Sequence, residues 1–136
     1  MKILAVDYGE RRTGLAVSDD LGITAQGLDT IETYNESEIV SLVARVAQET
    51  GAEKIVVGLP LNMNGTESDK SKKVRDFGAQ LAQITSLPVV FWDERMTSLQ
   101  AQRVMREMGK KTYGHKHMID RISATLILQE FMKTLT

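Results

Sequence analysis

The spacing of apolar residues changes near residue 34, from the short runs of strands to the longer period of helices. Residues 3–6 form a continuous apolar run that leads directly into Asp7, and residues 2–7 are predicted to form a strand buried on both faces. Residues 13–18 predict a second strand, which follows a glycine-bearing turn. Residues 24–33 predict a weaker third strand. The short turns imply that the three strands form an antiparallel meander.

Helices and short strands alternate in the rest of the chain. Asn35 and Glu38 predict a capping box for a helix that Gly51 ends, and a continuous apolar strand follows at residues 54–58. After a loop rich in asparagine and glycine, Thr66 is expected to cap a longer helix with a basic face. A strand, a helix, a basic loop and a final helix are expected at residues 87–92, 97–108, 110–117 and 118–132.

The order of elements, β-β-β-α-β-α-β-α-α, predicts an α/β fold. Hairpin strands followed by βαβ units give a mixed five-stranded sheet with helices on both faces. With 136 residues and no visible linker or repeat, the chain is expected to form a single domain over residues 1–136. Ligands of such sheets bind at the carboxyl ends of the parallel strands, where Asp7, Asn62 and Glu94 fall.

Composition narrows the class of protein. The chain is 42% hydrophobic and 26% charged, as in globular proteins, and has no cysteine for disulfides or cysteine-based zinc sites. The first strand begins at residue 2 and no apolar run reaches the roughly 18 residues of a membrane helix, so a cytoplasmic protein with no membrane partner is expected. Residues 19–69 hold ten acids and two bases, whereas residues 70–121 hold eleven bases and five acids. The basic segment suits either a solvated face or a face that binds a polyanion.

Three carboxylates are positioned to share one site. Asp7 ends the first strand, Glu94 follows the fifth, and Asp120 lies on the apolar face of the last helix. Each alone would more often pair with one of the nearby arginines, which are Arg11, Arg12, Arg95 and Arg121. Together, three carboxylates at one edge of a sheet predict a site for Mg²⁺ or Mn²⁺, ions that can activate water against a phosphodiester.

Basic and polar residues near these acids are candidates for contact with nucleic acid. Simpler interpretations exist, because asparagines also build turns and Arg95 also suits an ion pair with Asp93. Contacts to a nucleic-acid backbone would make binding weaken steeply with salt. The candidates are Arg11, Arg12, Asn62, Asn64, Lys70, Lys73, Arg95, Thr97, Lys110, Lys111, His115 and Lys116.

Four motifs, taken together, resemble one known family. They are Asp-Tyr-Gly-x-x-Arg-x-Gly-x-Ala at residues 7–16, Val-Gly-Leu-Pro-Leu-Asn-Met-Asn-Gly at 57–65, Asp-Glu-Arg-Met-Thr-Ser at 93–98 and Asp-Arg-Ile-Ser-Ala at 120–124. Their order and gaps match the YqgF (RuvX) family over residues 2–132. Many ribonuclease H-like enzymes have an acid at the end of the fourth strand. This chain has none in residues 58–62, which leaves the number of metal ions open.

The resemblance implies a ribonuclease H-like fold and nuclease activity, with Asp7, Glu94 and Asp120 as catalytic residues and metal ligands. It implies one of two substrates: precursor 16S rRNA, processed at its 5′ end during ribosome biogenesis, or a Holliday junction in DNA recombination and repair. Ribosome association fits the first, and the chain is expected to be a monomer or a homodimer. Two other classes stay open: a non-catalytic nucleic-acid-binding module, and an ATP-binding protein of the actin and sugar-kinase type.

Overall fold

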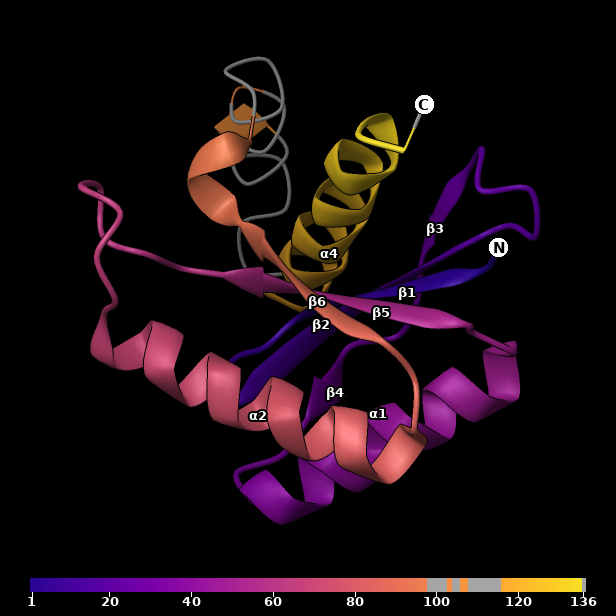
Figure 1. Cartoon of the computed structure of the whole chain (residues 1–136), viewed down its shortest axis with the longest axis horizontal. Coiled ribbons are helices and arrows are strands. Elements are labelled where there is room, and N and C mark those ends of the chain that lie inside the picture. The colour runs from indigo at the N-terminus through magenta and orange to yellow at the C-terminus, as the bar shows by residue number, and fades with distance from the viewer. Residues whose placement is uncertain (98–102, 104–105, 108–115, 136) are drawn as a thin grey trace.

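A mixed sheet is the frame of the molecule (Figure 1). The computed structural model describes residues 1–97, 103, 106–107 and 116–135. In the described residues the strands run in the order β3-β2-β1-β5-β6, with β4 also paired with β2. β1 is antiparallel to β2 and parallel to β5, and β5 is parallel to β6, which confirms the mixed α/β sheet. The strands are β1 (Ile3–Asp7), β2 (Arg12–Ser18), β3 (Ala25–Gly27), β4 (Ile31–Glu32), β5 (Lys54–Leu59) and β6 (Val89–Asp93).

The third strand corrects the sequence prediction, because residues 24–33 form two short strands and the described sheet has six strands rather than five. Ala16 of β2 pairs with Gly27 in β3, whereas Thr13 pairs with Ile31 in β4. Three steps along β2, from 13 to 16, therefore face four steps from 27 to 31. This is the extra residue of a β-bulge, which interrupts the ladder. The apolar pattern does not record one inserted residue, so the segment resembled a single strand.

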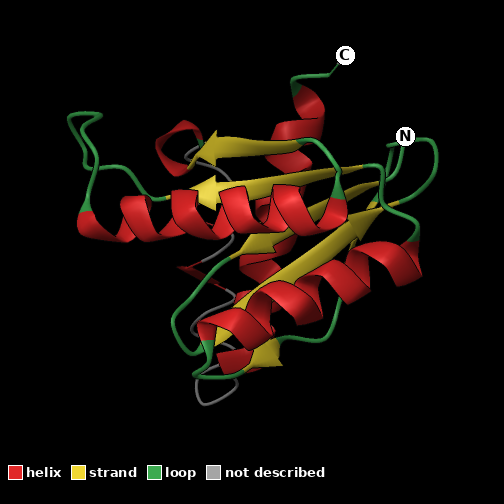
Figure 2. Cartoon of the chain, turned by 60° about the horizontal axis from the view of Figure 1, so that its bottom comes forward, coloured by secondary structure: helices red, strands yellow, loops and turns green. Residues whose placement is uncertain are grey.

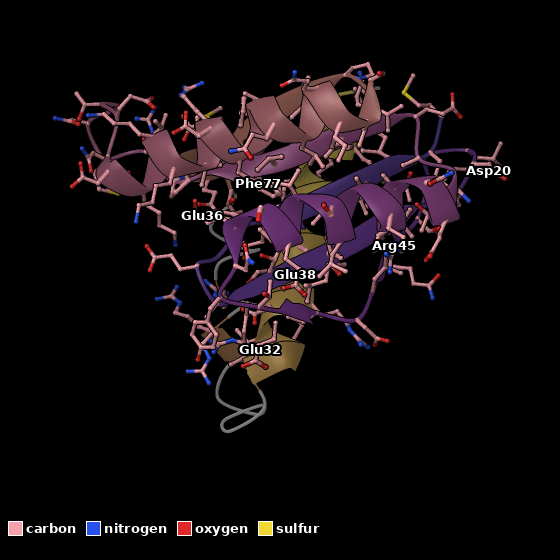
Figure 3. All side chains as sticks on the ribbon, turned by 90° about the horizontal axis from the view of Figure 1, so that it is seen from below. Asp20, Glu32, Glu36, Glu38, Arg45 and Phe77 are labelled. Carbon is pink, nitrogen blue, oxygen red and sulfur yellow. The ribbon has the colours of Figure 1, made fainter. Side chains whose placement is uncertain are left out.

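Helices cover both faces of the sheet, as predicted. α1 (Glu36–Thr50) and α2 (Asp69–Thr85) pack on one face, and α4 (Lys116–Lys133) packs on the other (Figure 2). Figure 3 views the first layer, in which α1 and α2 lie side by side and Phe77 of α2 is labelled. The ring of Tyr8 stacks on Phe77 with centroids 4.5 Å apart, which ties the segment after β1 to α2.

The first helix begins and ends where the sequence predicted. Asn35 accepts hydrogen bonds from the amides of Ser37 and Glu38, and Gly51 ends α1 in the left-handed conformation with φ of 74°. Glu38 does not complete a capping box in the described structure, because its carboxylate accepts a hydrogen bond from the hydroxyl of Thr33.

The expectation that Thr66 caps the second helix is wrong. Ser68 is the N-cap of α2, and its side chain and amide exchange hydrogen bonds with Ser71 in a capping box. The hydroxyl of Thr66 instead donates to Asn64 Oδ1 at 2.6 Å and accepts from Asn62 Nδ2 at 3.0 Å. The loop after β5 therefore satisfies its own polar side chains before α2 begins.

Alternation along β1 divides its side chains between two cores. Leu4 and Val6 face α1 and α2, whereas Ile3 and Ala5 face α4. All four side chains are at most 1% exposed. Asp7 continues this alternation, so its carboxylate lies on the α4 side at the carboxyl end of the strand.

The expected helix at residues 97–108 and the basic loop at 110–117 lie largely outside the described residues. Before them, η1 (Glu94–Met96) is a 3-10 turn, and residues 103, 106 and 107 are helical. α4 begins at Lys116, slightly earlier than the sequence predicted. None of the described helices is both long and apolar enough to span a membrane.

Candidate active site

Three carboxylates from distant parts of the chain meet at one edge of the sheet. Asp7 ends β1, Glu94 directly follows β6, and Asp120 lies near the start of α4. Asp7 has a glycine on each side of it in the sheet. Gly14 pairs with Asp7 across the β1–β2 ladder, and Gly58 continues the parallel register on the β5 side.

The two glycines leave room for the other two acids. A Cβ at Gly14 would overlap the backbone carbonyl of Asp120, and a Cβ at Gly58 would come within 3.0 Å of Glu94 Oε1. Strand alternation places both glycines on the same face as Asp7. The missing side chains therefore let α4 and the Glu94 side chain approach Asp7 closely.

Asp7 carries a charge that its described neighbours do not neutralise. Within the described residues, no hydrogen bond or ion pair reaches its carboxylate. Burial, followed by the nearby carboxylate of Glu94, raises the pKa of Asp7 to about 7, while Lys70 lowers it and Asp120 raises it further. Burial also raises the pKa of Glu94, against the opposing effect of Lys70. Two adjacent acids with raised pKa values mark an excess of negative charge that a cation would relieve.

Asp120, in contrast, has a counter-charge. Arg12 Nε donates to Asp120 Oδ2 at 3.0 Å, with both side chains about three-quarters buried or more. The sequence allowed this ion pair as the simpler interpretation of Asp120, and the structure confirms it. In the described part of the chain, no three acidic or histidine side chains are grouped closely enough to hold a metal ion. The three acids therefore share one edge of the sheet without forming a closed set of ligands.

A cavity of about 660 Å³ opens at this edge, between the β1–β2 turn and the start of α2. Asp7 and Asp120 line it. Four of the predicted nucleic-acid-binding cations line it as well: Arg11, Arg12, Lys70 and Lys73. Its volume is typical of a site for a small molecule or for part of a larger polar ligand. The sequence thus predicted the acids and the cations that the structure brings together here.

The lining also includes four residues that the sequence interpretation did not select: Tyr8, Gly9, Glu10 and Asp69. Tyr8 is buried and belongs to the core beneath α1 and α2. Glu10 pairs with Lys73 at 2.8 Å. The alternation that directs Leu4 and Val6 toward α2 also predicts the direction of Tyr8, so the sequence pattern could have placed Tyr8 here. The ion pair of Glu10 with Lys73 joins residues far apart in sequence, and no local pattern predicts it.

The remaining predicted contacts do not line this cavity. Arg95 Nη2 pairs with Asp93 at 2.7 Å and Nη1 donates to the carbonyl of Met63 at 3.3 Å, so Arg95 links η1 to the loop after β5. Asn62 and Asn64 hold that loop together through Thr66. The amide of Thr97 donates to the Glu94 carbonyl. Outside the described residues or side chains lie Lys110, Lys111, His115 and the side chain of Lys116.

The fold defines a class, that of the ribonuclease H-like α/β proteins. The structure resembles Thermus thermophilus RuvC in complex with a Holliday junction substrate, with a TM-score of 0.64 and 16% identity over 98% of this chain and 96% of that chain. It also resembles the fowlpox virus Holliday junction resolvase, with a TM-score of 0.61 and 12% identity over 100% of both chains. At these identities the likeness establishes the fold.

Sequence comparison gives the family. A family model described as "RuvX: Holliday junction resolvase" matches residues 1–134. A relative from Koribacter versatilis is 46% identical over 97% of this chain and 86% of the relative, and one from Agathobacter rectalis is 40% identical over 100% and 97%. Both carry the name "Putative pre-16S rRNA nuclease". The chain therefore belongs to the RuvX family of nucleases, as its motifs implied.

The uncompensated charge on Asp7 predicts that Asp7→Asn stabilises the protein. The pKa of Asp7 is higher in the folded state, so the folded protein holds the Asp7 proton more tightly than the unfolded chain does. The stability that this proton contributes is fully present below about pH 4 and is lost as the pH rises through about 7. At pH 8 in EDTA, Asp7→Asn should therefore raise the free energy of unfolding by roughly 2–4 kcal/mol, and much less at pH 4. Urea denaturation at both pH values measures the difference. Asp76→Asn, at an exposed position of α2, is the matched control, and equal effects of the two variants would contradict the prediction.

The close approach at the two glycines predicts unequal costs of adding a methyl group. Gly14→Ala should lower the free energy of unfolding by roughly 3 kcal/mol, because the added Cβ meets the backbone of α4. Gly58→Ala should cost only about 1 kcal/mol, because the ends of the Ile127 and Glu94 side chains can move.

Gly51→Ala is the control for this pair. Its Cβ would meet open space at the other end of β5, and its left-handed φ should cost about 1 kcal/mol. Urea denaturation of the three variants gives the ranking. A Gly14→Ala protein as stable as the wild type would show that α4 does not pack against Gly14.

Proposed function

We propose that the chain is a metal-dependent endonuclease that hydrolyses phosphodiesters of nucleic acid, and that its substrate is the 5′ region of precursor 16S rRNA. The observation that carries this proposal is the position of Asp7, which lines a cavity together with four cations. Glu94 lies near Asp7, and burial together with this neighbouring carboxylate raises the pKa of Asp7. Both relatives described above bear the pre-16S rRNA nuclease name, which supports the choice of substrate. The proposed setting is ribosome biogenesis in the cytoplasm.

The donor chemistry of the site fits Mg²⁺ or Mn²⁺. All three side chains are carboxylates, and these ions prefer oxygen ligands. Asp7, Glu94 and Asp120 would hold the ion, with Arg12 giving up its bond to Asp120. The bound ion would supply an activated water and positive charge for the phosphodiester.

The chain itself supplies binding and orientation. Arg11 and Lys73 line the same cavity as Asp7. Both are already in ion pairs, with Glu32 and Glu10, so their charges are partly neutralised. We assign them to contacts with the phosphates that flank the cleaved bond. These pairs are exposed and individually weak, so a phosphate can compete for the cations. Such contacts carry no sequence information, and recognition of the substrate would come from its shape.

A second candidate is a Holliday junction resolvase. The description of the matching family model favours it, and it would use the same acids on branched DNA. A two-fold symmetric junction would favour a homodimer, whereas trimming of rRNA does not require a dimer and could be done by a monomer. The two candidates differ in substrate rather than in chemistry.

One cleavage assay tests both candidates. Wild-type protein is offered a pre-16S rRNA fragment and a four-way DNA junction side by side, in EDTA, Mg²⁺ and Mn²⁺. We expect cleavage of the RNA only when a metal ion is present, and a loss of about 10³-fold or more in Asp7→Asn, because the ion would lose one of its carboxylate ligands. Asp76→Asn should cleave at the wild-type rate.

The outcomes separate the classes of function. Cutting of the junction alone would replace the RNA proposal with the resolvase. Cleavage by Asp7→Asn at the wild-type rate would contradict the assigned site. Binding of either substrate without cleavage under all conditions would indicate a non-catalytic binding module.

A further inference from the structure

One cation of the cavity differs from the other three. Arg11, Arg12 and Lys73 are in ion pairs with carboxylates, at 3.2, 3.0 and 2.8 Å. Lys70 also lines the cavity, and within the described residues it has no ion pair or hydrogen bond. A lysine whose charge is unused in the free protein remains available to a ligand.

The position of Lys70 directs this charge toward the acids. Lys70 lies in the first turn of α2, just after the N-cap Ser68, and is exposed. Its charge acts on both Asp7 and Glu94, favouring the ionised form of each. The start of α2 adds the positive end of a helix dipole on the same side of the cavity. An anion entering the cavity beside Asp7 would therefore meet Lys70.

The sequence of β5 gives this charge a particular use. Two-metal nucleases hold a second ion with further carboxylates, yet residues 58–62, which end β5 and follow it, contain no acid. Within the described residues the cavity is lined by two of the three candidate ligands, Asp7 and Asp120, and by no other acids than Glu10, paired with Lys73, and Asp69 at the start of α2. The described part of the chain thus offers three candidate ligands for one ion, together with a lysine, Lys70, that has no ion pair there.

We propose that Lys70 is a catalytic residue, whose ammonium group contacts a non-bridging oxygen of the scissile phosphate and supplies the positive charge that a second metal ion would bring elsewhere. This inference rests on the proposed nuclease function. In the reaction, a water oxygen bonds to phosphorus, the bond from phosphorus to the leaving oxygen breaks, and the proton lost by water is balanced by one that the leaving oxygen takes from solvent. Lys70 keeps its proton throughout and stabilises the added negative charge on the phosphate.

Steady-state kinetics on the cleaved substrate provides the first test. Lys70→Met should lower kcat by about 100-fold while KM changes by less than about threefold, as expected when a charge is used mainly in the transition state. Lys70→Arg, which keeps the charge, should recover part of kcat. Lys72→Met, exposed on the same helix and outside the cavity lining, should leave both constants unchanged. A wild-type kcat in Lys70→Met, or a loss confined to KM, would overturn the catalytic role.

Metal binding provides a second test that needs no cleavage. Calorimetric titration with Mn²⁺ should give one ion per wild-type chain, and Lys70→Met should bind Mn²⁺ roughly threefold or more tightly, because a positive charge facing Asp7 and Glu94 is removed. Lys72→Met should not change the affinity. Two ions per chain, or an unchanged affinity in Lys70→Met, would overturn the inference. If wild-type protein cleaves no substrate, the proposed function fails, and the titration still decides whether Lys70 faces the metal ligands.

Discussion

A half-buried carboxylate at the end of a core strand, with no described cation bonded to it, is the constraint on which the site depends. Withdrawing an unpaired charge from water is unfavourable, and here that cost appears as the raised pKa of Asp7. β1 can hold it because the strand is fixed from both sides. Leu4 and Val6 lie in one core and Ile3 and Ala5 in the other, so the strand cannot rotate to expose Asp7 without unpacking both.

The same alternation arranges the rest of the site. Gly14 and Gly58 flank Asp7 on the α4 face, where any side chain would push away the backbone at Asp120 or the carboxylate of Glu94. The acids can therefore approach one another because the residues on both sides of Asp7 in the sheet are glycines without side chains. Three chain segments far apart in sequence are brought within reach of one another by two missing Cβ atoms.

Much of this arrangement could be predicted from the sequence, because strand ends and helix faces follow from local patterns. The apolar runs that end at Asp7 and before Glu94, and the apolar helix face that includes Asp120, predict the three acids at one edge of the sheet. The pattern could not give the bulge between Gly27 and Ile31, since one inserted residue leaves no mark on a weak strand.

Contacts between distant residues were also beyond the pattern. The Arg12–Asp120 pair joins residues 108 positions apart, and the sequence offered several arginines for each acid. The choice of Ser68 over Thr66 as the cap of α2 depends on how the preceding loop uses Thr66, which only the folded loop decides. The close approach at Gly14 likewise depends on where α4 packs across β2, which is set by the tertiary structure and not by a local sequence pattern.

The distribution of counter-charges explains why Asp7, unlike Asp93 and Asp120, has no cation paired with it among the described residues. Arg12 is taken by Asp120, and Arg95 is taken by Asp93, which is next to Glu94 in sequence. Among the described residues this leaves Lys70 as the nearby charge that acts on Asp7 and Glu94 together, without an ion pair to either. A fold selected only for stability would place a cation against Asp7, because neutralising this carboxylate would not disturb the packing of the core. The two acids without a full counter-charge, one of which lines an open cavity, are the kind of local inconsistency expected at the proposed site for a cation and a phosphate.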